Sequence, residues 1–182
     1  YVVGKNGYAL SLGGSSYVDM GDSESLQING PLTMSFWMYT KSGSKDAGLV
    51  GTSKIEGVSG YLCTHHFAGS IYCYGPGQLS TDPTDPVEPN KWQHVVAQHT
   101  GKGHIYYVNG ELAGEFSGKS ALPGKADTAE LFVGKTHEGS REFLGLIDEV
   151  RVWNRVLSEE EVKKQMTASR LKLLGVAPQQ KL

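Results

Sequence analysis

The chain has 182 residues, 38% of them hydrophobic and 20% charged, and its formal net charge is −2 at pH 7. These are the proportions of a folded globular protein, so a disordered chain is excluded, and the lack of a basic cluster argues against nucleic acid as a partner. No apolar run approaches the ~20 residues that cross a membrane as a helix.

The 24 glycines follow no three-residue period, and they favour an all-β chain with many tight turns. Strands are predicted where apolar and polar residues alternate between clusters of Gly, Pro, Asn, Asp and Ser. The predicted strand segments are 8–12, 17–20, 32–39, 48–51, two arms of a hairpin within 60–75, 92–99, 104–116, 130–134 and a last one from 143. Asn109-Gly110, between two alternating runs, predicts a two-residue hairpin turn.

Two cysteines, Cys63 and Cys73, lie in the predicted hairpin GYLCTHHFAGSIYCYG. With a loop at 67–69 they are directly opposed, and Gly69 takes the position that favours a positive φ. Opposed Cβ atoms lie ~4.5–5.5 Å apart, close to the reach of a disulfide. We therefore predict a disulfide, which is typical of an exported protein, and the alternative is two reduced, buried cysteines.

The stretch FLGLIDEVRVWNRVLSEEEV (143–162) combines a strand pattern with two adjacent carboxylates, Asp148 and Glu149. Apolar residues alternate on one face up to Ile147, but from Val150 onward the alternation is shifted by one position. Both sets can face the core only if an extra residue interrupts the strand, so we predict a β-bulge at Asp148-Glu149.

A single short helix is predicted after this strand. Ser158 and Glu161 have the spacing of a capping box, and Leu157 with Val162 has that of a hydrophobic staple. An all-β chain with one short C-terminal helix predicts two packed antiparallel sheets, a jelly roll or a similar β-sandwich. We expect this domain at residues 1–168, with a tail or linker at 169–182.

Three stretches resemble the laminin-G-like (LamG-like jelly roll) domains of the concanavalin A-like lectin/glucanase superfamily, which are distantly similar to pentraxins. They are ALSLGGSSYVDMGDSESLQINGPLTMSFWMY (9–39), WQHVVAQHTGKGHIYYVNGELAG (92–114) and the 143–162 stretch. The resemblance implies an antiparallel sandwich. It leaves the function open, because this fold serves lectins, glycanases, lyases and adhesion modules.

The resemblance also implies a structural calcium ion near the first and last strands. Calcium mixes carboxylate with backbone carbonyl ligands, and a bulge leaves carbonyls unpaired. Asp148 is the leading candidate ligand, with Asp22 and Asp19 of YVDMGD as contributors. The alternative is that Asp148 accepts backbone N–H bonds and holds no ion. Many relatives carry an acid in the first turn, where this chain has Leu12-Gly13-Gly14.

Catalysis is not expected. The two carboxyl groups of a glycosidase flank the scissile bond, whereas adjacent strand residues point to opposite faces, so Asp148 and Glu149 form a poor pair. The chain also lacks the Glu-x-Asp-x-x-Glu strand of the glucanases in this superfamily and a recognisable lyase set. His94 is expected to be a hydrogen-bonded structural residue.

A carbohydrate site needs exposed aromatic faces beside polar groups. The candidate ligand-binding residues lie in the cysteine hairpin and in the loop before the last strand: His65, His66, Tyr72, Tyr74, His137, Glu138 and Arg141. The alternative is a solvated rim with partly buried tyrosines.

The sequence therefore predicts a secreted or cell-surface, non-catalytic recognition module within a larger protein, with carbohydrate as its ligand and calcium as a structural cofactor. An adhesion or spacer domain that contacts extracellular protein is the alternative. A divergent polysaccharide hydrolase or lyase is the third hypothesis.

Overall fold

The computed structural model describes residues 1–41, 46–52, 60–66, 69–75, 78–79, 87–117, 130–136 and 141–173. The strands of one sheet are β1 (Val2–Val3), β2 (Tyr8–Gly13), β4 (Leu32–Thr40), β9 (Trp92–His99), β10 (Gly103–Val108), β11 (Glu111–Ser117) and β13 (Leu144–Trp153). Those of the other are β3 (Val18–Asp19), β5 (Ala47–Gly51), β6 (Leu62–His65), β7 (Ile71–Gly75), β8 (Gln78–Leu79) and β12 (Phe132–Val133). The helices are the 3₁₀ turn η1 (Glu24–Leu26) and α1 (Glu159–Leu173).

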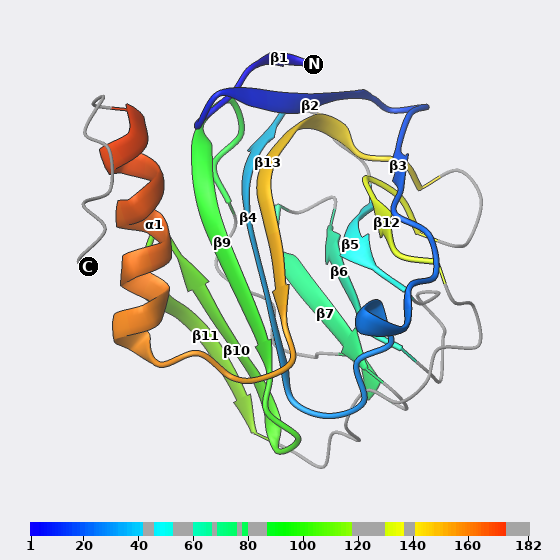
Figure 1. Ribbon diagram of the computed structural model, residues 1–182, viewed down its shortest axis with the longest axis vertical. Coiled ribbons are helices and arrows are strands. Elements are labelled where there is room, and N and C mark those ends of the chain that lie inside the picture. Colours follow the sequence, from blue (N-terminus) through cyan, green and yellow to red (C-terminus); the bar gives the residue numbers. More distant parts are fainter. Residues whose placement is uncertain are drawn as a thin grey trace.

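The two sheets pack face to face as a sandwich (Figure 1). The seven-stranded sheet has the order β1-β2-β13-β4-β9-β10-β11, and the six-stranded sheet has the order β3-β12-β5-β6-β7-β8. All recorded strand pairs are antiparallel, and the predicted all-β sandwich with one C-terminal helix is confirmed. Within the described residues, no helix is long and apolar enough to cross a membrane.

The core lies between the sheets and follows the period of two along each strand. On β4, Phe36 and Met38 belong to this core, whereas Ser35 and Trp37 point to the opposite face and are also buried. The strand predicted at 32–39 is therefore covered on both faces.

Helix α1 covers the outer face of the seven-stranded sheet (Figure 1). Leu157 and Val162 form a small apolar cluster there with Val96 of β9 and Tyr107 of β10. The helix continues to Leu173, past the boundary expected at 168. It thereby closes the far side of β9 and β10, which explains why those strands are apolar on both faces.

The hairpin between β10 and β11 turns at Asn109-Gly110, as predicted. Both residues have positive φ, 52° and 83°, which is the requirement of a type I′ turn. The Asn109 side chain also accepts a 3.0 Å hydrogen bond from the His94 backbone N–H, and this ties the turn to β9.

The bulge predicted in β13 is present. Asp148 lies opposite Trp37 of β4, but the next recorded pair is Arg151 with Ser35, so β13 has one extra residue. Glu149 lies in this bulge and has a φ of +52°, an uncommon value for a residue with a Cβ. The shift brings both Ile147 and Val152 toward the core side.

Candidate functional site

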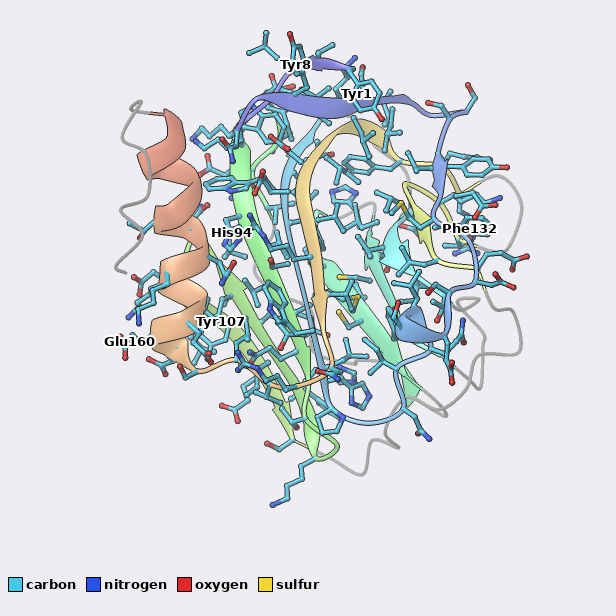
Figure 2. The ribbon with its side chains drawn as sticks, in the orientation of Figure 1. Tyr1, Tyr8, His94, Tyr107, Phe132 and Glu160 are labelled. Atoms are coloured by element: carbon cyan, nitrogen blue, oxygen red, sulfur yellow. The ribbon has the colours of Figure 1, made fainter. Side chains whose placement is uncertain are left out.

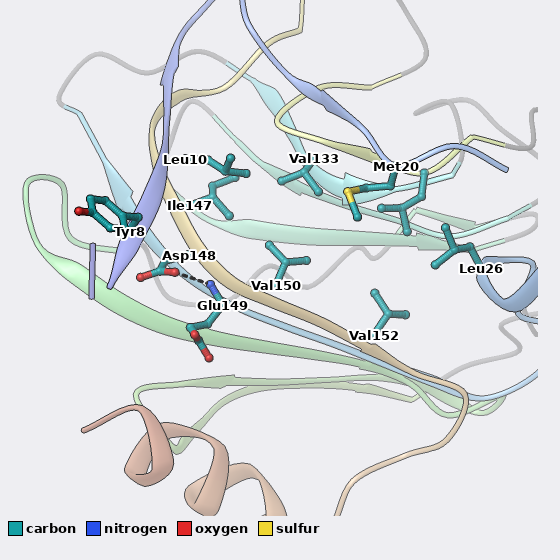
Figure 3. A pocket seen from close by; sticks show the side chains of 11 residues that line it. Tyr8, Leu10, Met20, Leu26, Val133, Ile147, Asp148, Glu149, Val150 and Val152 are labelled. Atoms are coloured by element: carbon teal, nitrogen blue, oxygen red, sulfur yellow. Dashed lines mark hydrogen bonds between the residues drawn. The ribbon is translucent and has the colours of Figure 1, made fainter. Parts of the chain in front are cut away.

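Asp148 lies at the bulge and is 7% exposed. Its Oδ2 accepts a 2.9 Å hydrogen bond from the Asn6 backbone N–H, and its Oδ1 accepts a 2.8 Å bond from the N–H of Glu149, which Figure 3 shows. The carboxylate therefore satisfies the backbone of the bulge and holds the N-terminal segment against it.

Glu149 points away from Asp148. Its Oε1 accepts a 2.9 Å bond from Asn6 Nδ2, and its Oε2 forms an ion pair with Arg151. Both carboxylates thus accept a bond from Asn6, Asp148 from its backbone N–H and Glu149 from its side-chain amide, and Glu149 is also paired with Arg151.

The three predicted calcium ligands do not fit a calcium ion as a set. Asp19 and Asp22 are exposed, and Asp19 belongs to β3 in the opposite sheet, where its Oδ1 accepts a 2.8 Å bond from the Gly21 N–H. Among the described residues, no group of three or more His, Cys, Asp or Glu side chains could hold a metal ion. The described residues give no support to a grouping of Asp148 with Asp19 and Asp22, which lie on different sheets or beside them, and the structural calcium stays a prediction.

The cysteine hairpin has the predicted register, with Cys63 of β6 directly opposite Cys73 of β7. Both are buried thiols whose Sγ atoms lie 3.2 Å apart. Gly69 has a φ of +91°, as expected from its place in the turn. A disulfide between these residues stays a prediction.

His65 is not available to a ligand. It lies on the same strand face as Cys63, is 3% exposed, and packs edge-on against Phe143 with ring centroids 6.1 Å apart. The prediction of His65 as a sugar ligand is therefore wrong, and the reason is the alternation of β6.

His66, by contrast, lies beside Tyr72 and Asp46. We call these three residues the His66–Tyr72 cluster. The imidazole and phenol rings have centroids 5.1 Å apart at a tilt of 48°, and the Asp46 carboxylate lies 3.7 Å from His66 Nε2. The His66 and Asp46 side chains are 29% and 36% exposed, so solvent reaches them. The cluster combines an aromatic ring, an imidazole and a carboxylate at the surface, near the start of β5 and the end of β6.

The other predicted ligand residues are placed only in part. The backbone carbonyl of Arg141 accepts a 3.0 Å bond from the Gly48 N–H of β5, and its side chain is partly exposed. The side chain of Tyr74 and the residues His137 and Glu138 lie outside the described part of the chain.

Sequence analysis missed a second aromatic group, on the outer face of β3 and β12. Tyr17 is 45% exposed and packs edge-on against Phe132, with ring centroids 5.5 Å apart. The Lys135 ammonium lies 3.6 Å from the centre of the Tyr17 ring and 4.0 Å from that of Phe132. Tyr17 is the first residue of the strand predicted at 17–20, but its contact with Lys135 depends on β3 and β12 being neighbours.

His94 and Trp37 lie on the side of the seven-stranded sheet that α1 partly covers, and Figure 2 labels His94 and Tyr107 there. Their rings are 5.2 Å apart, and His94 is 1% exposed. Within the described part of the chain neither His94 ring nitrogen has a hydrogen-bond partner, so the expected side-chain bond is not seen there. Burial, with the nearby charge of Arg151, lowers the pKa of His94 to about 4, so the ring is neutral near pH 7.

The fold is a jelly-roll sandwich with mixed aromatic and polar clusters at its surface, the class to which many recognition domains belong. A family model described as the concanavalin A-like lectin/glucanases superfamily matches residues 12–163, and the chain belongs to this family. The resemblance found in the sequence is confirmed.

A curated protein of Rattus norvegicus, "Sushi, von Willebrand factor type A, EGF and pentraxin domain-containing protein 1", is 27% identical over 149 residues. The match covers 72% of this chain but 4% of that protein, so the chain spans a small part of its length.

Two solved structures have a similar fold. The CBM40 domain of Ruminococcus gnavus IT-sialidase, bound to α2,3-sialyllactose, has a TM-score of 0.71 at 17% identity and covers 88% of this chain and 96% of its own. Domain 4 of AbnA, a GH43 extracellular arabinanase of Geobacillus stearothermophilus in complex with arabinotriose, has a TM-score of 0.71 at 19% identity, with 90% and 79% covered.

Proposed function

We propose that this chain is a non-catalytic carbohydrate-binding module that acts outside the cytosol, and that the His66–Tyr72 cluster binds the sugar. The observation that carries the proposal is the cluster itself: an imidazole 5.1 Å from a tyrosine ring and 3.7 Å from a carboxylate, with the charged groups reached by solvent.

The chemistry of the cluster matches that of a sugar. A pyranose presents an apolar C–H face and a rim of hydroxyl groups, so it binds where an aromatic ring lies beside hydrogen-bonding side chains. Tyr72 offers the ring, the Asp46 carboxylate accepts hydrogen bonds from hydroxyl groups, and His66 can donate or accept one. The strands β5, β6 and β7 hold these groups on a rigid support.

The relatives support this proposal. The family comprises lectins and glucanases, and both similar structures hold a bound oligosaccharide. Each of those domains belongs to a glycosidase. The match to this chain covers 96% of the CBM40 domain and 79% of the AbnA domain.

A glycan array with plant, bacterial and animal oligosaccharides tests the proposal. We expect binding to at least one glycan class, and we expect Tyr72→Ala or Asp46→Asn to weaken it at least tenfold. Tyr8→Ala is the matched control, because Tyr8 is a tyrosine 75% exposed on the other sheet, and it should bind as well as the unchanged chain. Binding to no glycan would reject the proposal and favour an adhesion or spacer domain.

A further inference from the structure

We propose that β13, beyond its bulge, binds an extended peptide segment as an added strand, with the peptide's apolar side chains in the groove below. This inference is independent of the sugar-binding proposal and concerns a different surface of the molecule.

One edge of β13 is open over its second half. On one side β13 pairs with β4 as far as Trp153, opposite Thr33. On the other side it pairs with β2 only from Leu144 to Ile147. No strand of the described chain lies beside β13 on that side after Ile147. An open strand edge presents main-chain N–H and C=O groups that can pair with another chain.

An apolar groove of about 340 Å³ lies directly beneath this open edge. One wall comes from β2 and β13, and the other from β3, η1, β12 and the residues beside them (Figure 3). The aliphatic residues that line it are Leu10, Met20, Leu26, Leu131, Val133, Ile147, Val150 and Val152. In Figure 3 the side chains of Val150 and Val152 point into the space between these walls.

One kind of occupant accounts for both features. A strand that paired with β13 would place every second side chain on the inner face of the sheet, which is where the groove lies. Its main chain would satisfy the open edge, and its apolar side chains would fill the groove, the two elements of recognition by strand addition. A compact ligand in the groove would leave the β13 edge unpaired.

The negative charge of Asp148 at one end of the groove indicates that the bound segment carries a positive charge there. Asp148 lies there, 7% exposed, and it makes no ion pair within the described residues, whereas Glu149 is paired with Arg151. A buried carboxylate is stabilised by a nearby cation. We therefore infer a segment of alternating aliphatic residues with a lysine or arginine at the end that reaches Asp148.

The mouth of the groove is apolar as well. Met20 is 55% exposed there, and a large apolar side chain left in solvent marks a surface that a partner can cover. Leu112 on β11 is 56% exposed but does not line the groove. The two residues form a matched pair for substitution.

The test uses the ¹⁵N-labelled full chain and peptides of alternating valine and threonine, with a lysine at either end because the strand direction is open. We expect one peptide to shift the amide signals of Val150, Val152 and Met20 and to slow hydrogen exchange at residues 149–153. Met20→Glu should weaken binding at least tenfold, whereas Leu112→Glu and Tyr72→Ala should leave it unchanged.

Twin peptides with proline in place of threonine and N-methylvaline in place of valine lack the main-chain donors of the alternating segment and should not bind. Equal binding of the proline twin would mean that the groove accepts apolar molecules without strand pairing, which overturns the proposal. Signal changes that depend on protein concentration without peptide would assign the edge to a second copy and also overturn it, as would shifts that avoid residues 149–153.

Discussion

The Asp148 carboxylate connects parts of the chain that are far apart in sequence. It accepts one backbone N–H from Asn6 and one from Glu149, and Gly4 lies so close that a Cβ there would come within 2.6 Å of Oδ2. Glu149 can hold its positive φ because its N–H and its carboxylate are both engaged. The bulge is thus stabilised by side-chain contacts and not by a glycine.

Replacing Asp148 with alanine leaves two partly buried N–H groups, those of Asn6 and Glu149, without these acceptors. We expect Asp148→Ala to lower the free energy of unfolding by about 2 kcal/mol in urea titrations. Asp22→Ala, at an exposed carboxylate, is the control and should change it by less than about 0.5 kcal/mol. Equal effects of the two substitutions would contradict the role given to Asp148.

The contacts of Asp148 also lead to a prediction about calcium. Because Asp148, Asp19 and Asp22 do not gather into one site, we expect the melting temperature to be the same with and without EDTA. Elemental analysis of the purified chain checks the same point. A stoichiometric calcium ion that is lost in Asp148→Ala would restore the ligand role expected from the family resemblance.

At the scale of elements, α1 is attached to the sheet by its first turn. The Ser158 Oγ accepts a 3.3 Å bond from the Glu161 N–H, and Glu161 Oε2 accepts a 2.9 Å bond from the Ser158 N–H. Glu161 also forms a two-point ion pair with Arg155. Leu157, just before the cap, is buried against the sheet. The capping box therefore sets both where the helix begins and how it docks.

Removing the cap should loosen this attachment. We expect Ser158→Ala to destabilise the protein by about 1 kcal/mol, measured by urea unfolding. Ser23 precedes η1 but makes no side-chain cap bond, so Ser23→Ala serves as the control and should have little effect. A null effect of Ser158→Ala would show that docking of Leu157 and Val162 alone sets the helix start.

At the scale of the whole molecule, both faces of the seven-stranded sheet bury histidines. His94 lies on the helix side, whereas His99 and His104, with rings 4.5 Å apart, lie on the strand faces that also carry Ala97 and Tyr106 of the core. Burial lowers the pKa of each of the three from 6.5 to about 4, with Arg151 contributing at His94 and His99 contributing at His104. The fold therefore favours their neutral forms.

The stability of the molecule should fall in acid for this reason. Below pH 6.5 the unfolded chain binds protons on these histidines while the folded chain does not, so stability is lost as the pH falls from about 6.5 to about 4. We expect on the order of 1 kcal/mol per pH unit for each histidine, by urea titrations at several pH values.

Histidine ring signals in NMR spectra isolate this effect from the titration of carboxylates. The signals of His94, His99 and His104 should not titrate in the folded protein between pH 7 and about pH 5. A normal titration of all three near pH 6.5 would contradict the prediction.

The features that the sequence predicted correctly are set by neighbours along the chain. The bulge at Asp148-Glu149 follows from a phase shift within one strand, and the Asn109-Gly110 turn and the Ser158 cap follow from residues a few positions apart. Even the burial of His65 had a signal, because an inward Cys63 implies an inward residue two positions later.

The features that only the tertiary structure decided depend on which strands become neighbours. β3 joins β12 in the six-stranded sheet, which places Asp19 and Asp148 on different sheets and creates the Tyr17–Lys135 contact. β2 leaves β13 after Ile147, which opens the edge above the groove. Periodicity along one strand determines which face a residue occupies. It does not determine which strand lies beside it, because that choice depends on packing energies summed over the whole core.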